Sequence, residues 1–372
     1  MLRSALALSP TWLRASSWRR DDSQVETMFG PEHYATVALA AERAGFDALF
    51  RPDAMTLDPE RLADSPGFAN IDPLVLLAYL AAVTERIGLF TTASTTFAPP
   101  FLVARQLQSL DRVSGGRAGL NAVTSLGGAE NFGDQPMASS EDRLARASEW
   151  LDVVAALWAS FPDEALVMDR AAGRFADPHL VRPVDFAGEQ IAVKGPIDVP
   201  AVSRGRIPVM MAGGGPAWTD QAGRHADAVF VACPTDEVAA ATRLALRDAA
   251  SRHGRADDAV ATMPGLSLHL ADSRAEAEAL AAASRTEGDP RHPLGGPLHW
   301  TVIGTVDDAA DEIERRAGAG IVDGFVALPG GWRGSIDLVT EELMPELARR
   351  GLVRGGGDSS TLAERWALVP PS

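Results

Sequence analysis

The chain is poor in cysteine and in basic residues, and both shortages exclude classes of protein. Cys233 is the single cysteine among 372 residues, which excludes a disulfide framework and a cysteine-based metal site and favours the reducing cytoplasm. The 34 Lys and Arg residues stand against 50 Asp and Glu residues, for a net charge of -16. Because nucleic acids and anionic membrane surfaces repel a surface of this sign, we expect neither as a partner.

Several patterns that mark familiar kinds of site are also absent. No apolar run approaches the ~20 residues that a helix needs to cross a bilayer. The histidines have no H-x-x-x-H or similar spacing, so we expect no metal site. No G-x-S-x-G elbow indicates a hydrolase. No Gly-Lys-Ser/Thr completes a P-loop, and no G-x-G-x-x-G follows a strand to hold NAD(P).

The sequence does contain a regular alternation of apolar strands and amphipathic helices. Eight strands are expected, at Leu2–Leu8, Phe46–Phe50, Ile87–Ser94, Arg117–Val123, Pro208–Ala212, Asp227–Ala232, Thr262–Leu270 and Asp323–Leu328. Eight such units favour a (β/α)8 TIM barrel over a doubly wound sheet. No Ser/Pro-rich or charged linker divides the chain, so we predict a single domain over residues 1–372.

Two excursions from the barrel pattern are expected, after strands 4 and 7. Residues 162–206 contain FAGEQIAVKGPIDVP, which suggests a hairpin. Residues 285–303 form a short Pro/Gly-rich loop that includes HPLGGPLHW. The final segment, residues 352–372, is expected to be a tail in which GGGDSS precedes a short end segment.

Candidate binding residues follow the expected strands, because barrel enzymes bind ligands at the carboxyl ends of their strands. Asp53 follows the second strand and could accept a hydrogen bond from a ligand, or it could be a solvated loop carboxylate. Thr92 lies near the end of the third strand, where Thr is also common for reasons of strand propensity. Asn121 lies within the apolar fourth strand, and a buried amide needs partners.

The turn formed by Gly213, Gly214 and Gly215 follows the fifth strand and precedes a helix. Three glycines let the backbone approach a ligand closely, and the helix start would aim N–H groups at an anion such as a phosphate. A plain tight turn between a strand and a helix explains the same residues, and the turn alone does not decide between the two.

The stretch SLDRVSGGRAGLNAVTS, from Ser109 to Ser125, resembles a motif of the family that includes nitrilotriacetate monooxygenase, dibenzothiophene-sulfone monooxygenase and pristinamycin IIA synthase. These are bacterial-luciferase-like flavin enzymes. Further matches occur in order along the chain, among them KGPIDVP, RHADAVF and GTVDDAADEIERRAGAGIVDGF. The resemblance implies a luciferase-like barrel and an FMN-dependent, two-component monooxygenase. A separate NAD(P)H:flavin reductase supplies reduced FMN, and the barrel uses O2 to oxygenate a small or medium organic substrate. We also expect a homodimer or larger homo-oligomer.

The resemblance also carries residues over. Asp53 and Thr92 match positions that contact FMN, and Asn121 lies in the motif that lines the flavin. Ser140 and Leu144 stand where the family usually has His and Tyr directed toward the flavin. A further set of positions departs from the family pattern: Gly215 replaces a phosphate-binding Ser, and Leu126 falls where a His is proposed as catalytic in the alkane enzyme. No catalytic residue is assigned.

Those departures leave two alternatives open. The chain could be a flavin-poor, non-catalytic barrel subunit that pairs with an active homologue. It could also be an F420-dependent oxidoreductase, although GGRAGLNAVTS resembles the FMN branch more closely. The sequence assigns neither the substrate nor the atom that is oxidised.

Overall fold

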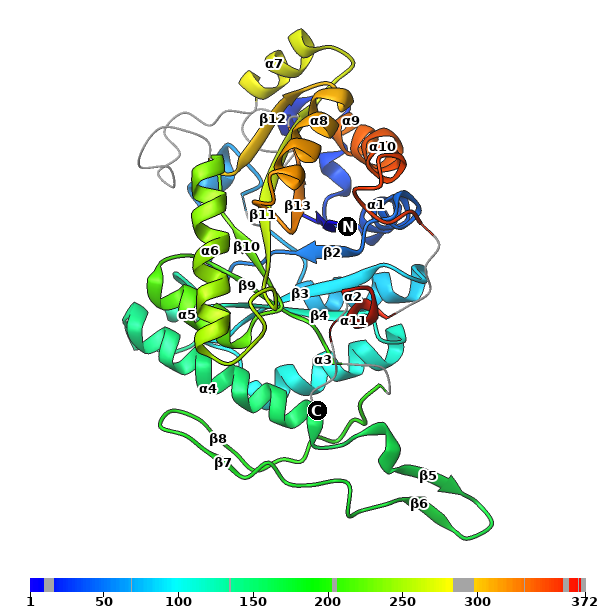
Figure 1. Ribbon diagram of the computed structural model, residues 1–372, viewed down its shortest axis with the longest axis vertical. Helices are drawn as coiled ribbons and strands as arrows, with labels where there is room; N and C mark the ends of the chain where they lie inside the picture. Colours follow the sequence, from blue (N-terminus) through cyan, green and yellow to red (C-terminus); the bar gives the residue numbers. More distant parts are fainter. Residues whose placement is uncertain are drawn as a thin grey trace.

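The computed structural model describes residues 1–9, 17–67, 69–133, 135–202, 206–283, 298–330, 332–356, 361–366 and 368. Within them, eight parallel strands form a closed barrel surrounded by helices (Figure 1). The barrel strands are β1 (Arg3–Ala7), β2 (Ala48–Arg51), β3 (Gly88–Ser94), β4 (Ala118–Val123), β9 (Val209–Ala212), β10 (Ala228–Val231), β11 (Ala261–Leu270) and β13 (Gly324–Pro329).

Two pairings close the ring of strands. β1 pairs with β13 from Arg3↔Gly324 onward, and β10 pairs with β11 from Ala228↔Ala261 onward. All the pairings between barrel strands are parallel. The TIM-barrel prediction is therefore confirmed, and the expected strands correspond one to one with the observed ones.

Helices follow the barrel strands and cover the outside of the ring. They are α1 (Pro31–Ala44), α2 (Pro73–Val83), α3 (Pro100–Ser114), α4 (Ser140–Ala159), α5 (Pro216–His225), α6 (Asp236–Arg252), α7 (Arg274–Ala283), α8 (Val306–Gly318), α9 (Gly334–Leu338), a π-helical turn at Val339–Leu343 and α10 (Met344–Arg349). Local chemistry sets their ends: the Asp72 side chain accepts a hydrogen bond from the Val75 N–H at 3.0 Å, and Thr305 and Asp308 form a capping box. No helix in the described parts of the chain is both long and apolar enough to cross a membrane.

The inside of the barrel is filled with side chains in its lower half, toward the amino ends of the strands. Phe50, Phe90, Met210 and Met263 are buried there in one apolar cluster. Gly119 faces Phe90, and a Cβ on that glycine would lie 2.6 Å from the ring. The barrel is therefore a packed core rather than a pore, as usual for this architecture.

A short helix near the chain end, α11 (Leu362–Arg365), closes the amino-terminal opening of the barrel. Leu362 and Trp366 join the inner cluster, and the Trp366 ring stacks on Phe90 with centroids 5.0 Å apart. Arg3 donates to the Trp366 carbonyl at 2.9 Å. The sequence predicted only a tail in this region, whereas the end segment is part of the core.

The expected excursion after the fourth barrel strand consists of two hairpins that project beyond α4 (Figure 1). One is β5 (Leu166–Asp169) with β6 (Arg174–Ala176), and the other is β7 (Phe186–Ala187) with β8 (Ala192–Val193). The Glu149 carboxylate on α4 accepts backbone N–H bonds from the residues 189–191 turn at 2.9–3.0 Å. These bonds hold the second hairpin to the barrel.

The second expected excursion differs from its prediction. Residues 284–297 lie outside the described residues, but Trp300–Gly304 is a strand, β12, where a loop to residue 303 was expected. It pairs with the upper half of β11, from Leu266↔Trp300 to Leu270↔Gly304. The prediction was wrong because the strand is five residues long and its apolar alternation is hidden beside Gly and Pro.

Candidate functional site

Thr92 and Asn121 lie side by side inside the barrel, near the carboxyl ends of β3 and β4. They are register partners in the parallel pairing of these strands, and both side chains are buried. Asn121 Nδ2 donates to Thr92 Oγ1 at 2.9 Å. Thr92 Oγ1 in turn donates to the Arg51 carbonyl on β2 at 2.7 Å. A chain of hydrogen bonds thus crosses three neighbouring strands.

These hydrogen bonds determine which way the Asn121 amide points. The Thr92 hydroxyl has one proton, and that proton goes to the Arg51 carbonyl, so the hydroxyl oxygen must accept from Asn121. The amide therefore presents its NH2 group to Thr92 and directs its oxygen elsewhere. Asn121 Oδ1 is buried and has no hydrogen-bond partner among the described residues. An acceptor left in this state costs about 1–3 kcal/mol unless a ligand or water supplies a donor.

Asp53 follows β2 directly and lies at the same edge of the barrel. Its side chain is half-buried. Burial raises the pKa of the Asp53 carboxyl above its ordinary value, and the nearby Asp72 carboxylate acts in the same direction. The neighbouring Arg51 side chain is fully buried, donates to Leu8 O and Asn70 Oδ1, and lies over the Tyr34 ring. These contacts hold the end of β2 in place beneath Asp53.

The three glycines follow β9, the strand that pairs with β4 beside Asn121. Gly213, Gly214 and Gly215 are exposed, and a Cβ on Gly214 or Gly215 would meet nothing within 4 Å. Gly215 is the N-cap of α5 and supplies no side-chain cap. The first N–H groups of α5 therefore start beneath an open glycine turn, the arrangement by which helices commonly bind anions.

Asp53, Thr92, Asn121 and the glycine turn thus lie at the carboxyl edge of four strands that are consecutive around the barrel, β2, β3, β4 and β9. Ser140 and Leu144 are less clearly connected to this group. Ser140 is exposed in the first turn of α4, and its neighbour Ser139 caps the helix. Leu144 packs against the main apolar core. Among the described residues, no hydrogen bond or ion pair joins either residue to Asn121 or Thr92, so their roles stay predictions.

Sequence reasoning missed a polar group on the opposite wall of the barrel. Gly265 on β11 faces inward, since a Cβ there would meet Phe230 and Leu328, and strand alternation places Ser267 and His269 on the same face. The Ser267 hydroxyl lies 3.3 Å from His269 Nε2. The signal was available in the sequence as the polar residues at every second position near the end of a buried strand.

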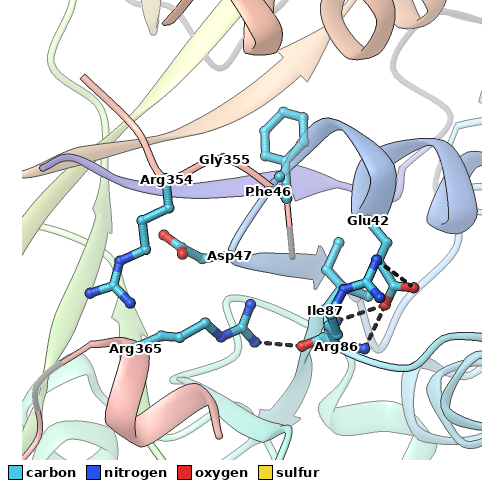
Figure 2. Close-up of a pocket in the computed structure, with 10 residues that line it drawn as sticks. Glu42, Phe46, Asp47, Arg86, Ile87, Arg354, Gly355 and Arg365 are labelled. Carbon is cyan, nitrogen blue, oxygen red and sulfur yellow. Dashed lines mark hydrogen bonds and ion pairs between the residues drawn. The ribbon is translucent and has the colours of Figure 1, made fainter. Parts of the chain in front are cut away.

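A small cavity also exists at the other end of the barrel, beside Asp47 and Arg365 (Figure 2). Its volume of about 20 Å³ holds little more than a single water. Its wall is mutually paired: Glu42 accepts N–H bonds from Arg86 at 2.6 Å and Ile87 at 2.9 Å. This cavity is too small for an organic ligand, and its groups serve the structure.

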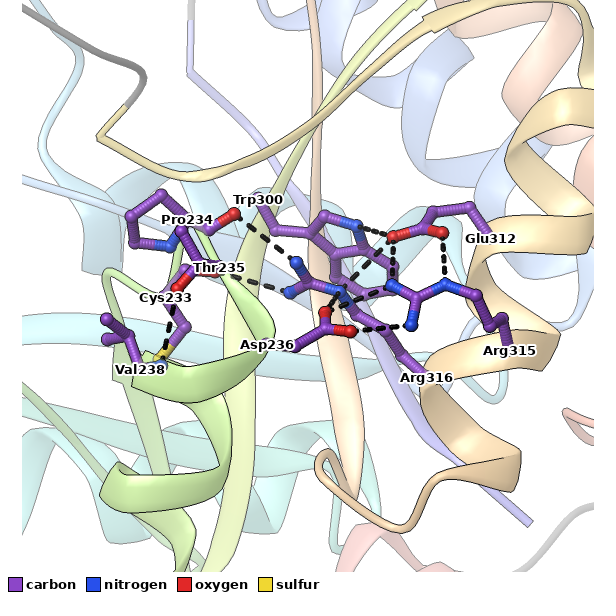
Figure 3. A network of polar contacts seen from close by, with 9 residues as sticks. All are labelled: Cys233, Pro234, Thr235, Asp236, Val238, Trp300, Glu312, Arg315 and Arg316. Carbon is purple, nitrogen blue, oxygen red and sulfur yellow. Dashed lines mark hydrogen bonds and ion pairs between the residues drawn. The ribbon is translucent and has the colours of Figure 1, made fainter.

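A second polar cluster holds β12 and α8 to the loop after β10 (Figure 3). The buried Arg316 guanidinium lies 4.4 Å from the Trp300 ring centroid. It donates to the carbonyls of Cys233 and Pro234 at 3.3 Å each, and it pairs with Asp236 at 3.0 Å. Every charge drawn in this cluster has an opposite partner, so the cluster stabilises the fold.

The fold defines a (β/α)8-barrel protein, and these residues form a candidate ligand site at the carboxyl ends of its strands. Residues 12–365 match the model of the family described as luciferase-like monooxygenase, and the chain belongs to that family. It is 31% identical to a dibenzothiophene-sulfone monooxygenase of Rhodococcus erythropolis over 95% of this chain and 93% of the relative. It is 29% identical to nitrilotriacetate monooxygenase component A of Aminobacter aminovorans, with the same coverage of both chains. A long-chain alkane monooxygenase has the same fold, with a TM-score of 0.90, 22% identity and coverage of 98% of this chain and 95% of that one.

Proposed function

We propose that this enzyme is the oxygenase component of a two-component, FMN-dependent monooxygenase. A separate NAD(P)H-dependent reductase would supply reduced FMN, and O2 and an organic substrate would meet it in the barrel. When bound, reduced FMN supplies the two electrons that split O2. One oxygen atom enters the substrate, the other leaves as water, and oxidised FMN is released.

The observation that carries this proposal is the buried Asn121 Oδ1, held by Thr92 without a hydrogen-bond partner among the described residues. An isoalloxazine ring carries an N–H group that such an acceptor would bind. A hydrogen bond to this N–H group would remove the free-energy cost of the unpartnered Asn121 oxygen, and this gain would add to the affinity for FMN.

The other predicted residues fit the remaining parts of FMN. The open turn at Gly214 and Gly215 offers backbone N–H groups to the phosphate at the start of α5. The half-buried Asp53 carboxylate could accept from a ribityl hydroxyl or a ring N–H. The apolar cluster of Phe50, Phe90, Met210 and Met263 leaves no room for water in the part of the barrel beneath this site, and excluding water there would strengthen polar contacts to a bound flavin.

The family does not determine the substrate. Two relatives are named for dibenzothiophene sulfone, which has no charge, and for nitrilotriacetate, a tricarboxylate, so the same family includes enzymes for both chemistries. The protein's own task is the same in each case: it binds the flavin, excludes water and orients the substrate.

Anaerobic titration with FMN and with reduced FMN tests the proposal. We expect saturable binding to the purified chain, and an oxygenated product from a member of a broad substrate panel when a flavin reductase, NADH and O2 are added. No binding at high micromolar flavin would refute it. Binding without any oxygenation of a broad substrate panel would instead support the non-catalytic subunit, and activity only with a co-purified homologue would support it further.

A further inference from the structure

Two loops at the carboxyl edge of the barrel expose large apolar side chains. Leu126 is 90% exposed and Phe132 is 53% exposed in the loop after β4, and Leu57 is 47% exposed in the loop after β2. Soluble proteins bury such side chains where they can, and a group of them left exposed at one place marks a binding surface. Leu126 is the most exposed large apolar residue in the described chain.

The two loops are joined to each other and to the end of β3, so these side chains belong to one surface. Asn131 Nδ2 donates to the Met55 carbonyl at 2.8 Å, which ties the loop after β4 to the loop after β2. The Phe132 ring stacks on Phe97 in the loop after β3, with centroids 4.4 Å apart. We call the exposed residues Leu57, Leu126 and Phe132 the apolar mouth.

The apolar mouth lies directly above the proposed flavin site. Only four residues separate Asn121 from Leu126, and Ser125 between them is held to β3. Its hydroxyl lies 2.8 Å from the Ser94 hydroxyl, and its N–H donates to Thr96 Oγ1 at 3.2 Å. Leu126 therefore lies in the loop that directly follows the strand of Asn121, at the same end of the barrel.

The same two loops are acidic. The described side chains of these loops include the carboxylates Asp53, Asp58, Glu60, Asp64, Asp72 and Glu130. Arginines also lie near this rim: Arg143 of α4 donates to Ala138 O, and Arg146 Nε donates to Thr96 O at 3.3 Å. The loop after β1 is joined to the loop after β2 by the Trp18 Nε1 bond to Asp64 O at 2.8 Å, and it carries Arg19 and Arg20 together with Asp21, Asp22 and Glu26. Carboxylates therefore still outnumber arginines there. A carboxylate substrate would meet repulsion at this rim, in a chain whose net charge is already -16.

We propose that the substrate is an uncharged, largely apolar molecule that packs on the apolar mouth, and that the acidic rim rejects carboxylates. This inference rests on the proposed function, because it uses the flavin site to define where a substrate must lie. Apolar contact supplies affinity, and like charge supplies discrimination against anions.

A matched pair of ligands with one aromatic ring system tests the inference. We would measure binding of methyl 2-naphthoate and of 2-naphthoate to the FMN-loaded protein by calorimetry at pH 7.5. The neutral ester is expected to bind at least about tenfold more tightly than the acid. Equal binding, tighter binding of the acid, or binding of neither compound would overturn the inference.

Two variants make the test specific to the mouth. Leu126→Arg places a positive charge there and is expected to strengthen binding of 2-naphthoate by about tenfold while weakening that of the ester. Leu244→Arg makes the same change at an exposed Leu of α6 and is expected to alter neither affinity. If both variants change the affinity for 2-naphthoate equally, the overall charge of the protein determines this affinity and not the apolar mouth, and the inference is wrong. If FMN itself does not bind, the proposed function fails; if FMN binds and the ester does not, only this inference fails.

Discussion

The two ends of the barrel are built from the same strands but treat their polar groups differently. At the amino end, the buried Arg117 guanidinium donates to Thr84 Oγ1 and to four backbone carbonyls at 2.7–3.2 Å, and Trp366 fills the opening. At the carboxyl end, Asn121 keeps a buried acceptor without a partner among the described residues, and Leu126 is exposed. The amino end is closed by the protein's own side chains, although Trp366 Nε1 also lacks a hydrogen-bond partner among the described residues, whereas we expect the carboxyl end to receive a ligand.

This difference separates stability from function along the barrel axis. Changes at the amino end should alter the free energy of unfolding and leave flavin affinity alone. Changes at the carboxyl end should alter flavin affinity and leave the free energy of unfolding nearly unchanged. Substitutions at each end therefore test whether stability and flavin affinity are separated in this way.

The largest effect is expected from Trp366→Ala at the amino end. The ring is buried against Phe90 and beneath the Arg3 guanidinium, 5.1 Å from its centroid, so its removal leaves a large cavity. Loss of a buried Trp costs about 3–5 kcal/mol of unfolding free energy. Urea denaturation measures this cost, and FMN titration of the folded variant should give the parent affinity. A variant that loses flavin affinity but not stability would contradict the assignment of this end.

A smaller effect of opposite sign is expected from Asp111→Asn, at the end of α3 beside the start of β4. Burial raises the pKa of the Asp111 carboxyl to about 6, although the Ala118 N–H that it accepts at 3.1 Å favours the charged form. The folded state thus holds this proton more tightly than the unfolded state, so ionisation destabilises the fold as the pH rises from about 4 to 6.

Asn keeps the acceptor for Ala118 N–H and removes the charge. We expect the variant to be more stable than the parent by about 1–3 kcal/mol at pH 8, with the gap roughly halved at pH 5. Urea unfolding at both pH values measures the gap. A constant gap, or a less stable variant at pH 8, would show that Asp111 is stabilised as the anion by contacts other than Ala118.

The barrel was predictable because each of its eight strands is a short apolar run between turn residues, a signal that survives without tertiary context. The placement of Asp53, Thr92 and Asn121 was predictable for the same reason, since they follow or end such runs and parallel strands bring their carboxyl ends to one edge; their roles stay predictions. The sequence could not show that Asn121 donates to Thr92 and not the reverse. This direction depends on the Arg51 carbonyl of the neighbouring strand, which accepts the Thr92 proton.

Other features escaped prediction because they join residues far apart in the chain. Trp366 reaches Phe90 only after the ring of strands has closed, and β12 is recognisable as a strand only beside the upper half of β11. His269 has no metal-ligand spacing to another histidine, so that pattern did not single it out. Its alternation with Ser267 on β11 is what places it near the carboxyl end of the barrel.

The third prediction tests the carboxyl end through Asn121→Leu. The substitution removes the orphaned oxygen and keeps a side chain of similar length, so the stability of the free protein should stay the same or rise slightly. FMN affinity should fall by about tenfold, since one hydrogen bond to the ring is lost. Fluorescence titration and thermal unfolding give the two readouts. Thr92→Val, which frees the amide to rotate, should weaken FMN several-fold, and Thr92→Ser should not. Lower stability with unchanged affinity would make Asn121 a structural residue.

The smallest effect is expected at the glycine turn, where the structure separates two substitutions that the sequence treats alike. The family resemblance predicts a phosphate-binding Ser at the position of Gly215, but Gly215 has φ of 93°, a conformation that an L side chain adopts only with strain. Ser at this position should therefore gain a hydrogen bond to phosphate, while backbone strain offsets part of the free energy gained. Gly214 has no such φ and open space around its Cβ, so Gly214→Ser should tighten FMN binding about two- to fivefold. Riboflavin, which lacks the phosphate, is the matched control ligand and should bind parent and variant equally. Equal gains for FMN and riboflavin would place the phosphate elsewhere, and the anion-binding assignment of this turn would then be wrong.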